Sequence, residues 1–216
     1  MADGLDERMM RRAIAVAMAH LGKTAPNPTV GCVIARGETI LAEAATAPGG
    51  SPHAEEQAVP LAGAGARGAT AYVTLEPCGA RSSGACSCSE HLAAAGISRV
   101  VIACEDVSPL ASGQGLQRLR AAGLAVEIGV LAADADVLSA GFRHRLATGM
   151  ARVEAADGPD SYEGIFDPGR AQDLRSALLE AGAKGLNRLW TPRHGEVAKR
   201  LSAAGLLFQN PLEALR

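Results

Sequence analysis

The chain has 216 residues, of which 48% are hydrophobic, 20% are charged and 3% are aromatic, and its formal net charge is −2. This balance is typical of a globular protein, and no basic run exceeds Arg11-Arg12, which argues against a nucleic-acid partner. The apolar runs are too short to cross a bilayer, and the charged N-terminus lacks a signal peptide's apolar core. We therefore expect a cytoplasmic protein without a membrane partner, whose five cysteines bind metal or lie buried rather than form disulfides.

The first predicted elements are a helix and a hairpin. Apolar residues at helical spacing predict a helix over residues 7–22. Two β-branched runs that turn around residues 36–38 predict a hairpin over residues 29–44. Ser51 is the expected N-cap of the next helix, with Pro52 at its first position.

Three strand–helix pairs follow along the chain. The predicted strands cover residues 70–75, 99–104 and 124–130. The helices that follow them cover residues 88–95, 115–123 and 132–149. Alternation of this kind predicts a layered α/β domain whose later strands are parallel. Sites in such sheets lie at the carboxyl ends of the strands, and the first of these strands leads into the cysteine-rich stretch.

The composition changes near residue 150. Residues 149–170 are rich in Gly, Asp and Pro, which predicts a linker or an irregular loop. Beyond it, residues 171–182 and 196–207 have helical patterns, and residues 187–191 between them have a strand pattern. We expect a first domain over residues 1–150 and a short helical appendage over residues 151–216.

The most specific feature of the sequence is an ordered set of His, Glu and Cys residues. His53 and Glu55 open one predicted helix, and after one strand Pro77-Cys78 is followed by a further Cys at the next helix. This order matches the zinc-deaminase signature H-x-E…P-C-x-x-C. Three protein ligands leave the fourth zinc position open for water, whose pKa the metal lowers, and an unligated carboxylate can move its proton. The pattern favours one catalytic zinc per chain, with Glu55 as the acid–base residue, over buried structural cysteines.

Cys86 and Cys88 compete for the third ligand position. Moving the ligand by two residues would rotate it by about 200° around the following helix. A loop can absorb an extra residue at little cost. The register counted back from the helix end therefore favours Cys88, with Cys86 as the alternative. Cys32 and Cys104 lie in apolar strands and are expected in the core.

The sequence resembles the deaminase half of the bifunctional riboflavin-biosynthesis deaminase/reductase family over residues 8–150. The resemblance rests on "PNPTVGCVI", "PHAE", "GATAYVTLEPC", "AAGISRVVIACED" and "GFRHR", which begin at residues 26, 52, 68, 94 and 141. It implies a three-layer α/β/α, cytidine-deaminase-like domain with a mixed five-stranded sheet. It also implies metal ligands His53, Cys78 and Cys88, and a pocket in which Asn27 and the Ala54 carbonyl contact the substrate.

Several pocket positions depart from that family. Thr46 stands where the family has a histidine, and the loop between the two cysteines, which includes Arg81 and Ser82, has a different sequence and one more residue. "DVSP", which begins at Asp106, replaces Asp-Pro-Asn-Pro. These positions form part of the family's substrate pocket. The altered loop either binds the substrate phosphate through residues such as Arg81 and Ser82 or is a solvated, flexible connection. The departures concern the substrate rather than the type of reaction.

The C-terminal segment resembles only the end of the family's second domain. In the family the deaminase is followed by a longer, NADPH-dependent reductase, whose glycine-rich cofactor contact is replaced here by "TPRHG" at residues 191–195. A segment this short cannot enclose a dinucleotide, so we expect neither NADPH binding nor reductase activity.

The leading hypothesis is a zinc-dependent hydrolytic deaminase of a small aminopyrimidine, diaminohydroxyphosphoribosylaminopyrimidine of riboflavin biosynthesis first of all. One alternative is a deaminase of another nucleobase, nucleoside or related heterocycle. Another is a non-catalytic zinc-stabilised module, against which Glu55 argues, because a structural site has no use for an unligated carboxylate. By analogy with the superfamily, we expect a homodimer or homotetramer.

Overall fold

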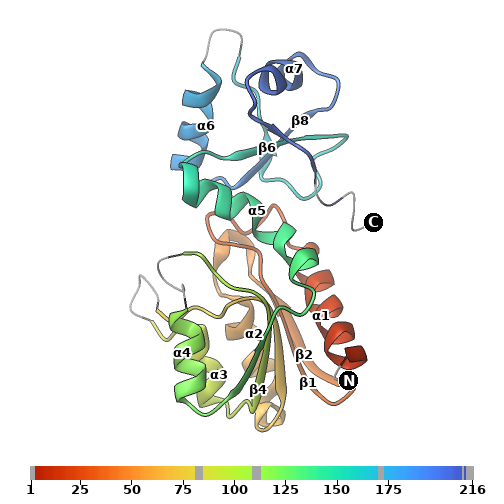
Figure 1. The fold of residues 1–216 in the computed structure, drawn as a ribbon, viewed down its shortest axis with the longest axis vertical. Coiled ribbons are helices and arrows are strands. Elements are labelled where there is room, and N and C mark those ends of the chain that lie inside the picture. The colour runs from red at the N-terminus through yellow and green to blue at the C-terminus, as the bar shows by residue number, and fades with distance from the viewer. Residues whose placement is uncertain (1–2, 81–84, 109–112, 170–172, 211, 213–216) are drawn as a thin grey trace.

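The computed structural model describes residues 3–80, 85–108, 113–169, 173–210 and 212, and these residues build two separate β-sheets (Figure 1). The first sheet is mixed, with strand order β2-β1-β3-β4-β5. Its strands are β1 Gly31–Arg36, β2 Thr39–Ala45, β3 Thr70–Leu75, β4 Arg99–Cys104 and β5 Ala125–Ile128. Strand β1 runs antiparallel to β2 and β3, while β3, β4 and β5 are parallel. The predicted mixed five-stranded sheet is confirmed.

Helices cover both faces of this sheet. Helices α1 and α5 pack together on one face, and α2, α3 and α4 cover the other (Figure 1). Their bounds are α1 Asp3–Met18, α2 Ala54–Ala62, α3 Cys88–Ala94, α4 Gln114–Ala121 and α5 Ala132–Thr148, and two short 3-10 helices span Pro48–Gly50 and Gly63–Ala66. Because both faces are covered, β3 and β4 are buried almost throughout and read as continuous apolar runs. The three-layer architecture places the core between the sheet and its helices.

Two helices begin at capping boxes that fix their first residues. Helix α2 begins at Ala54 with His53 as its N-cap, and the Glu56 carboxylate accepts a 2.6 Å hydrogen bond from the His53 N–H. The prediction that Ser51 caps this helix is therefore wrong, because the capping box forms between His53 and Glu56, and the N-cap lies two residues after Ser51. Helix α3 begins at Cys88, and Ser87 is its N-cap.

The second sheet is parallel, with strand order β7-β8-β6-β9. Its elements are β6 Arg152–Ala156, β7 Gly164–Ile165, α6 Leu174–Ala183, β8 Arg188–Pro192, α7 Glu196–Ala203 and β9 Leu207–Phe208. The expectation of a helical appendage after an irregular linker is wrong, since β6 and β7 lie in the supposed linker. Strand β6 was not predictable from periodicity because its centre is the buried Glu154, which pairs with Arg188 on β8.

The two sheets meet through α5 and the loop that follows α1. Gly22 has φ of 80°, and a Cβ there would lie 2.5 Å from the Tyr162 backbone nitrogen. A Cβ at Gly141 on α5 would lie 2.8 Å from the Asn187 carbonyl oxygen. Only glycine allows backbones to approach this closely. No helix in the described ranges combines the length and apolar character that a bilayer crossing requires.

Candidate active site

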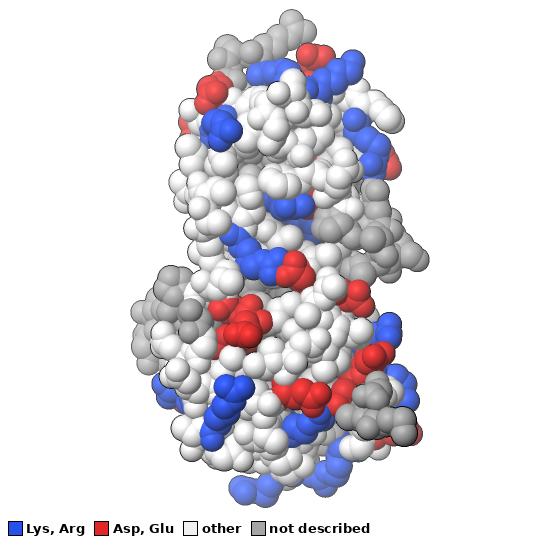
Figure 2. Space-filling model, in the orientation of Figure 1, with Lys and Arg blue, Asp and Glu red and all other residues white. Residues whose placement is uncertain are grey.

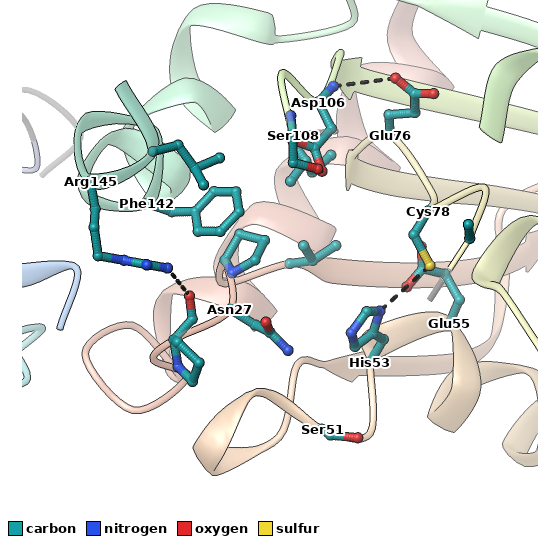
Figure 3. Close-up of a pocket in the computed structure, with 16 residues that line it drawn as sticks. Asn27, Ser51, His53, Glu55, Glu76, Cys78, Asp106, Ser108, Phe142 and Arg145 are labelled. Atoms are coloured by element: carbon teal, nitrogen blue, oxygen red, sulfur yellow. Dashed lines mark hydrogen bonds between the residues drawn. The ribbon is translucent and has the colours of Figure 1, made fainter. Parts of the chain in front are cut away.

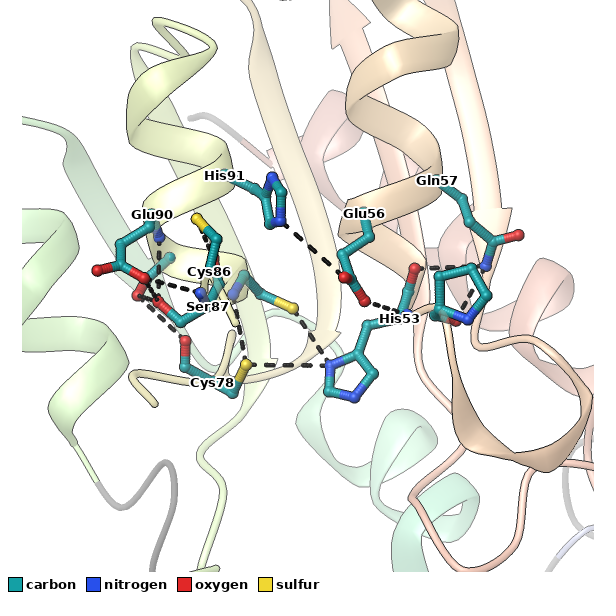
Figure 4. Close-up of polar contacts among 11 residues, drawn as sticks. His53, Glu56, Gln57, Cys78, Cys86, Ser87, Glu90 and His91 are labelled. Atoms are coloured by element: carbon teal, nitrogen blue, oxygen red, sulfur yellow. Dashed lines mark hydrogen bonds and ion pairs between the residues drawn. The ribbon is translucent and has the colours of Figure 1, made fainter. Parts of the chain in front are cut away.

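A cluster of one imidazole and two thiols lies at the carboxyl end of β3 (Figure 4). His53 comes from the N-cap of α2, Cys78 from the loop after β3, and Cys88 from the first residue of α3. The His53 Nδ1 lies 3.3 Å from the Cys88 Sγ and 3.9 Å from the Cys78 Sγ. All three ligand atoms lie within 4.8 Å of one another, so one ion could contact them together.

The chemistry of this donor set fits zinc. Imidazole nitrogen and thiolate sulfur are its usual ligands, and three of them leave a position for water. Hydrogen bonds from Cys88 and from His53 hold the pKa of the Cys78 thiol well below its usual range. The Cys88 backbone N–H also points at the Cys78 Sγ, 3.3 Å away, as expected at a helix N-terminus. Cys78 is therefore ready to bind a metal as thiolate.

Cys86 lies outside the cluster. It is exposed, and its thiol faces the Ser87 carbonyl oxygen at 3.8 Å. Ser87 is the N-cap of α3: its Oγ accepts from the Glu90 N–H, and its own N–H donates 2.7 Å to the Glu90 carboxylate. This capping box turns Cys88 inward, and the geometry supports Cys88 rather than Cys86 as the third ligand.

The start of α3 is also tied directly to Cys78. The Ser89 N–H and hydroxyl both donate to the Cys78 carbonyl oxygen, at 3.2 and 3.1 Å. Ser87 and Ser89 are buried, and their hydroxyls lie 3.1 Å apart. The two sulfur ligands are therefore held by contacts between the ends of the intervening loop.

Glu55 lies in the first turn of α2, where it is 2% exposed. It lines the same cavity as His53 and Cys78 (Figure 3). Burial raises the pKa of Glu55 to about 7. A carboxyl group with a pKa near neutrality can both accept and give a proton, as general acid–base chemistry requires.

The cavity has a volume of about 510 Å³, which is within the range of small-molecule sites. It is lined by Pro26, Asn27, Pro28, Val30, Ser51, His53, Glu55, Leu75, Glu76, Cys78, Ala80, Asp106, Ser108, Phe142, Arg145 and Leu146. Figure 3 shows His53, Glu55 and Cys78 on one side, and Phe142 and Arg145 of α5 across from them. The cavity therefore has a proton-transfer end and a cationic end.

Of the sequence-predicted substrate residues, Asn27 and Asp106 line this cavity. The Asn27 Nδ2 donates 2.7 Å to the Gly50 carbonyl oxygen, which fixes the amide orientation. The Asp106 carboxylate accepts from the Ser108 N–H at 2.8 Å and from its hydroxyl at 2.9 Å. Both predictions gain a position in the pocket, although their contact with substrate stays a prediction.

The other predicted substrate residues are not brought to the cavity. Thr46 is 2% exposed, and its Oγ1 accepts a 3.0 Å hydrogen bond from the Val30 N–H. It therefore braces the start of β1, and its assignment as a pocket residue is corrected. Ala54 is fully buried and is absent from the described cavity lining. Arg81 and Ser82 lie outside the described residues.

Sequence reasoning gave no site role to five polar or aromatic residues of the lining: Ser51, Glu76, Ser108, Phe142 and Arg145. Glu76 accepts hydrogen bonds from the backbone N–H groups of Asp106 and Leu116, at 3.3 and 3.2 Å, and so joins the loops after β3 and β4. Phe142 and Arg145 belong to the "GFRHR" stretch, which carried the family resemblance. That stretch was the sequence signal from which these two residues could have been assigned to the pocket.

Fold and site together define a zinc-binding deaminase domain, and comparison with known proteins gives the same class. Residues 4–104 match the model of the cytidine and deoxycytidylate deaminase zinc-binding region. Over 145 residues, the chain is 37% identical to the diaminohydroxyphosphoribosylamino-pyrimidine deaminase of Buchnera aphidicola, covering 67% of this chain and 98% of that protein. The chain belongs to this family of riboflavin-biosynthesis deaminases.

The chain is also similar to longer proteins. It is 42% identical over 149 residues to the riboflavin biosynthesis protein RibD of Escherichia coli, but the match spans only 40% of that protein and 69% of this chain. Acinetobacter baumannii RibD form 2 superposes on 70% of this chain and 42% of its own with a TM-score of 0.65 at 44% identity. Form 1 covers 94% of this chain and 84% of its own at 25% identity and a TM-score of 0.77, so this likeness extends into the second sheet.

Proposed function

We propose that this protein is a zinc-dependent deaminase that hydrolyses an amino group of diaminohydroxyphosphoribosylaminopyrimidine, an intermediate of riboflavin biosynthesis. The observation that carries the reaction type is Glu55, a buried carboxyl group beside the His53, Cys78 and Cys88 cluster in a cavity of about 510 Å³. The substrate is suggested by the names of the relatives, one of which has nearly its whole length covered by this chain.

The proposed mechanism assigns the metal to His53, Cys78 and Cys88, with one zinc per chain. A bound zinc ion supplies Lewis acidity that lowers the pKa of water in its open position. Glu55 accepts the proton of the attacking water and delivers it to the departing amino group. The ring carbon gains a C–O bond and loses its C–N bond, and the products are ammonia and a ring carbonyl.

Asn27 orients the substrate ring or ribose in this proposal. Its Nδ2 donates to the Gly50 carbonyl oxygen, and in this proposal its Oδ1 would accept a hydrogen bond from the ligand. Cavity walls such as Val30, Leu75 and Phe142 would pack against the ring and exclude water. Substrate binding thus needs only a few placed polar groups.

The organisation around this pocket supports a small-molecule enzyme of two domains, residues 1–150 and 151–216. Figure 2 shows basic and acidic side chains intermixed over the described surface of one face, without a continuous basic stripe. A nucleic-acid backbone would need such a stripe. A purely structural zinc module is disfavoured because Glu55 is a buried carboxyl group in the same cavity as His53 and Cys78, and a structural site has no use for it.

The decisive experiment measures ammonia release with three kinds of substrate: the phosphorylated pyrimidine, its dephosphorylated form and a panel of free bases and nucleosides. We expect the phosphorylated compound to give the highest kcat/KM, with loss of one amino group confirmed by mass spectrometry. Preferential turnover of a base or an unphosphorylated nucleoside would retain the deaminase chemistry and reject the proposed substrate. No turnover of any compound by zinc-loaded protein would reject the enzyme.

A further inference from the structure

We propose that Arg145 binds the phosphate of the substrate, and that Asn187 of the second sheet is the positioning residue that holds Arg145 in place. This inference rests on the proposed function and adds a specificity role for residues that lie far from the zinc ligands. It assigns the C-terminal part of the chain a role in holding a residue of the deaminase pocket.

The charges of the cavity point to Arg145 as the anion contact. Among the described residues of the lining, Arg145 is the only Lys or Arg, while three are carboxylic acids: Glu55, Glu76 and Asp106. Glu76 and Asp106 already accept hydrogen bonds from the loops around them. Among the described lining residues, these carboxyl groups would repel a phosphate, whereas Arg145 on the α5 side would stabilise it.

The arrangement of the cavity gives the substrate one direction. The amino group that leaves must reach Glu55 and the His53 cluster, on the side opposite Arg145 (Figure 3). A substrate whose ring is at Glu55 therefore extends its ribosyl phosphate across the cavity to α5. The Arg145 guanidinium also lies 5.8 Å from the centre of the Phe142 ring, a second contact that orients it.

Arg145 is fixed before any ligand binds. Its Nε donates 2.7 Å to the Asn187 Oδ1, and its Nη2 donates 2.7 Å to the Pro26 carbonyl oxygen. Within the described residues these bonds use Nε and one terminal nitrogen, which leaves Nη1 to bind a phosphate oxygen. A guanidinium that is already ordered loses less conformational entropy on binding, and its planar donors suit phosphate.

Asn187 links the second sheet to two parts of the pocket. It is 5% exposed and lies directly before β8, where its backbone N–H donates 2.7 Å to the Glu163 carboxylate. Its Nδ2 donates to the Asn27 carbonyl oxygen at 3.3 Å, while its Oδ1 accepts from Arg145. One amide therefore sets both Arg145 and the loop that carries Asn27.

The test compares the phosphorylated pyrimidine with its dephosphorylated form in Arg145→Gln, Arg145→Lys and Asn187→Ala. Loss of a charge-assisted hydrogen bond predicts that Arg145→Gln raises KM for the phosphorylated substrate by roughly 10- to 100-fold, with kcat changed less than about threefold. KM for the dephosphorylated compound should change much less, because that compound has no phosphate for Arg145 to bind. Arg145→Lys should recover part of the loss, and Arg175→Gln, on the exposed side of α6, serves as the charge-loss control.

A double-mutant experiment tests whether Asn187 acts through Arg145. Because it holds Arg145, Asn187→Ala should raise the ratio of KM for the phosphorylated substrate to KM for the dephosphorylated one, and it should not raise this ratio further when Arg145 is already Gln. A loss that acts through the Asn27 loop changes both substrates and cancels in the ratio. Additive effects on the ratio, or no change of the ratio in Asn187→Ala, would overturn the positioning role. Thermal unfolding and zinc content of each variant identify a protein that is simply misfolded.

A binding experiment distinguishes failure of the proposed function from failure of the proposed anion site. If the wild type turns over no phosphorylated pyrimidine, calorimetry with ribose 5-phosphate still tests the anion site. Binding by the wild type that weakens at least about tenfold in Arg145→Gln would support the inference. Absent binding, or equal binding by both proteins, would overturn it.

Discussion

Glu55 and the three candidate zinc ligands lie within 36 residues of one another in the sequence, from residue 53 to residue 88, and close together in space. His53 and Glu55 are separated by one residue at the start of α2, so the helix places one at the N-cap and the other in the first turn. Cys88 is the first residue of α3. The N-termini of α2 and α3 therefore both lie at the site, and their dipoles favour negatively charged ligands and developing negative charge.

At the residue scale, Glu55→Gln should abolish turnover while leaving fold and zinc intact. The amide cannot accept a proton, and a general acid–base group typically contributes roughly 10²- to 10⁴-fold to the rate. Steady-state kcat and zinc content by mass spectrometry measure the two effects. Retention of more than about a tenth of the wild-type kcat would contradict the role of Glu55.

The choice between the neighbouring cysteines gives a second prediction at this scale. Cys88→Ser should lose zinc because Cys88 is buried in the ligand cluster, whereas Cys86→Ser should keep it because Cys86 is exposed outside. The two proteins are matched controls for each other, and metal analysis after dialysis compares them. The reverse result would reassign the third ligand to Cys86.

At the element scale, a buried ion pair joins α1 to two strands. The Asp6 carboxylate accepts from Arg99 at 2.8 and 2.7 Å and from the Tyr72 hydroxyl at 2.9 Å. Hydrogen bonds from Arg99 lower the pKa of Asp6 below its usual value. Helix α1 is thus fastened across β3 and β4 by one acidic side chain that is 5% exposed.

Asp6→Asn should lower the free energy of unfolding by about 1–3 kcal/mol at neutral pH, because Arg99 loses a charged partner. The folded-state pKa of Asp6 is depressed, so its contribution is present above the unfolded pKa of roughly 3.9 and is lost as pH falls through the folded value. The variant and the wild type should therefore converge in acid. Urea unfolding at several pH values measures this, with Glu7→Gln, an exposed pair on the same helix, as the control. A constant difference across pH would contradict the prediction.

The sequence predicted best those elements whose signal is local. Strands β3 and β4 were predicted with their observed bounds, because buried strands covered on both faces form unbroken apolar runs. The ligand cluster was predicted from a motif that lies at element boundaries. Strand β6 was missed because its central residue, Glu154, is a charged side chain that is buried with Arg152, Tyr162 and Arg188 as partners, the last of them 34 residues away. The Arg145 contacts to Asn187 and Pro26 span 42 and 119 residues, and no local pattern indicates them.

At the scale of the whole molecule, the close approach of α5 to the second sheet has a measurable consequence. Alanine is favoured over glycine in a helix by about 1 kcal/mol. At Gly141, however, the added methyl would lie 2.8 Å from the Asn187 carbonyl oxygen, so the contact must open. We expect Gly141→Ala to be destabilising by about 1–3 kcal/mol. Gly4→Ala is the matched control, since its methyl meets only the Arg8 side chain at 3.4 Å and should stabilise. Thermal unfolding compares them, and a stabilised Gly141→Ala protein would contradict the close approach.

The second sheet also bears on cofactor use. Its strands are short, with β7 and β9 containing two residues each, and the two cavities of about 370 and 490 Å³ beside it are open to solvent rather than enclosed. We predict no reductase activity and no NADPH binding. Calorimetry and an NADPH oxidation assay measure these, with a RibD protein that carries the longer reductase as the positive control. Micromolar binding of NADPH to this chain would contradict the prediction.

The capping box at Ser87 has a consequence for how such enzymes can diversify. Ser89 fastens α3 to the Cys78 carbonyl oxygen, and Glu90 fastens Ser87, so both anchor points of the segment between Cys78 and Ser87 are set by their own hydrogen bonds. Insertions and deletions in that segment can accumulate during evolution without displacing the two sulfur atoms. A library randomised in length and composition there would sample new substrate preferences on an unaltered catalytic centre.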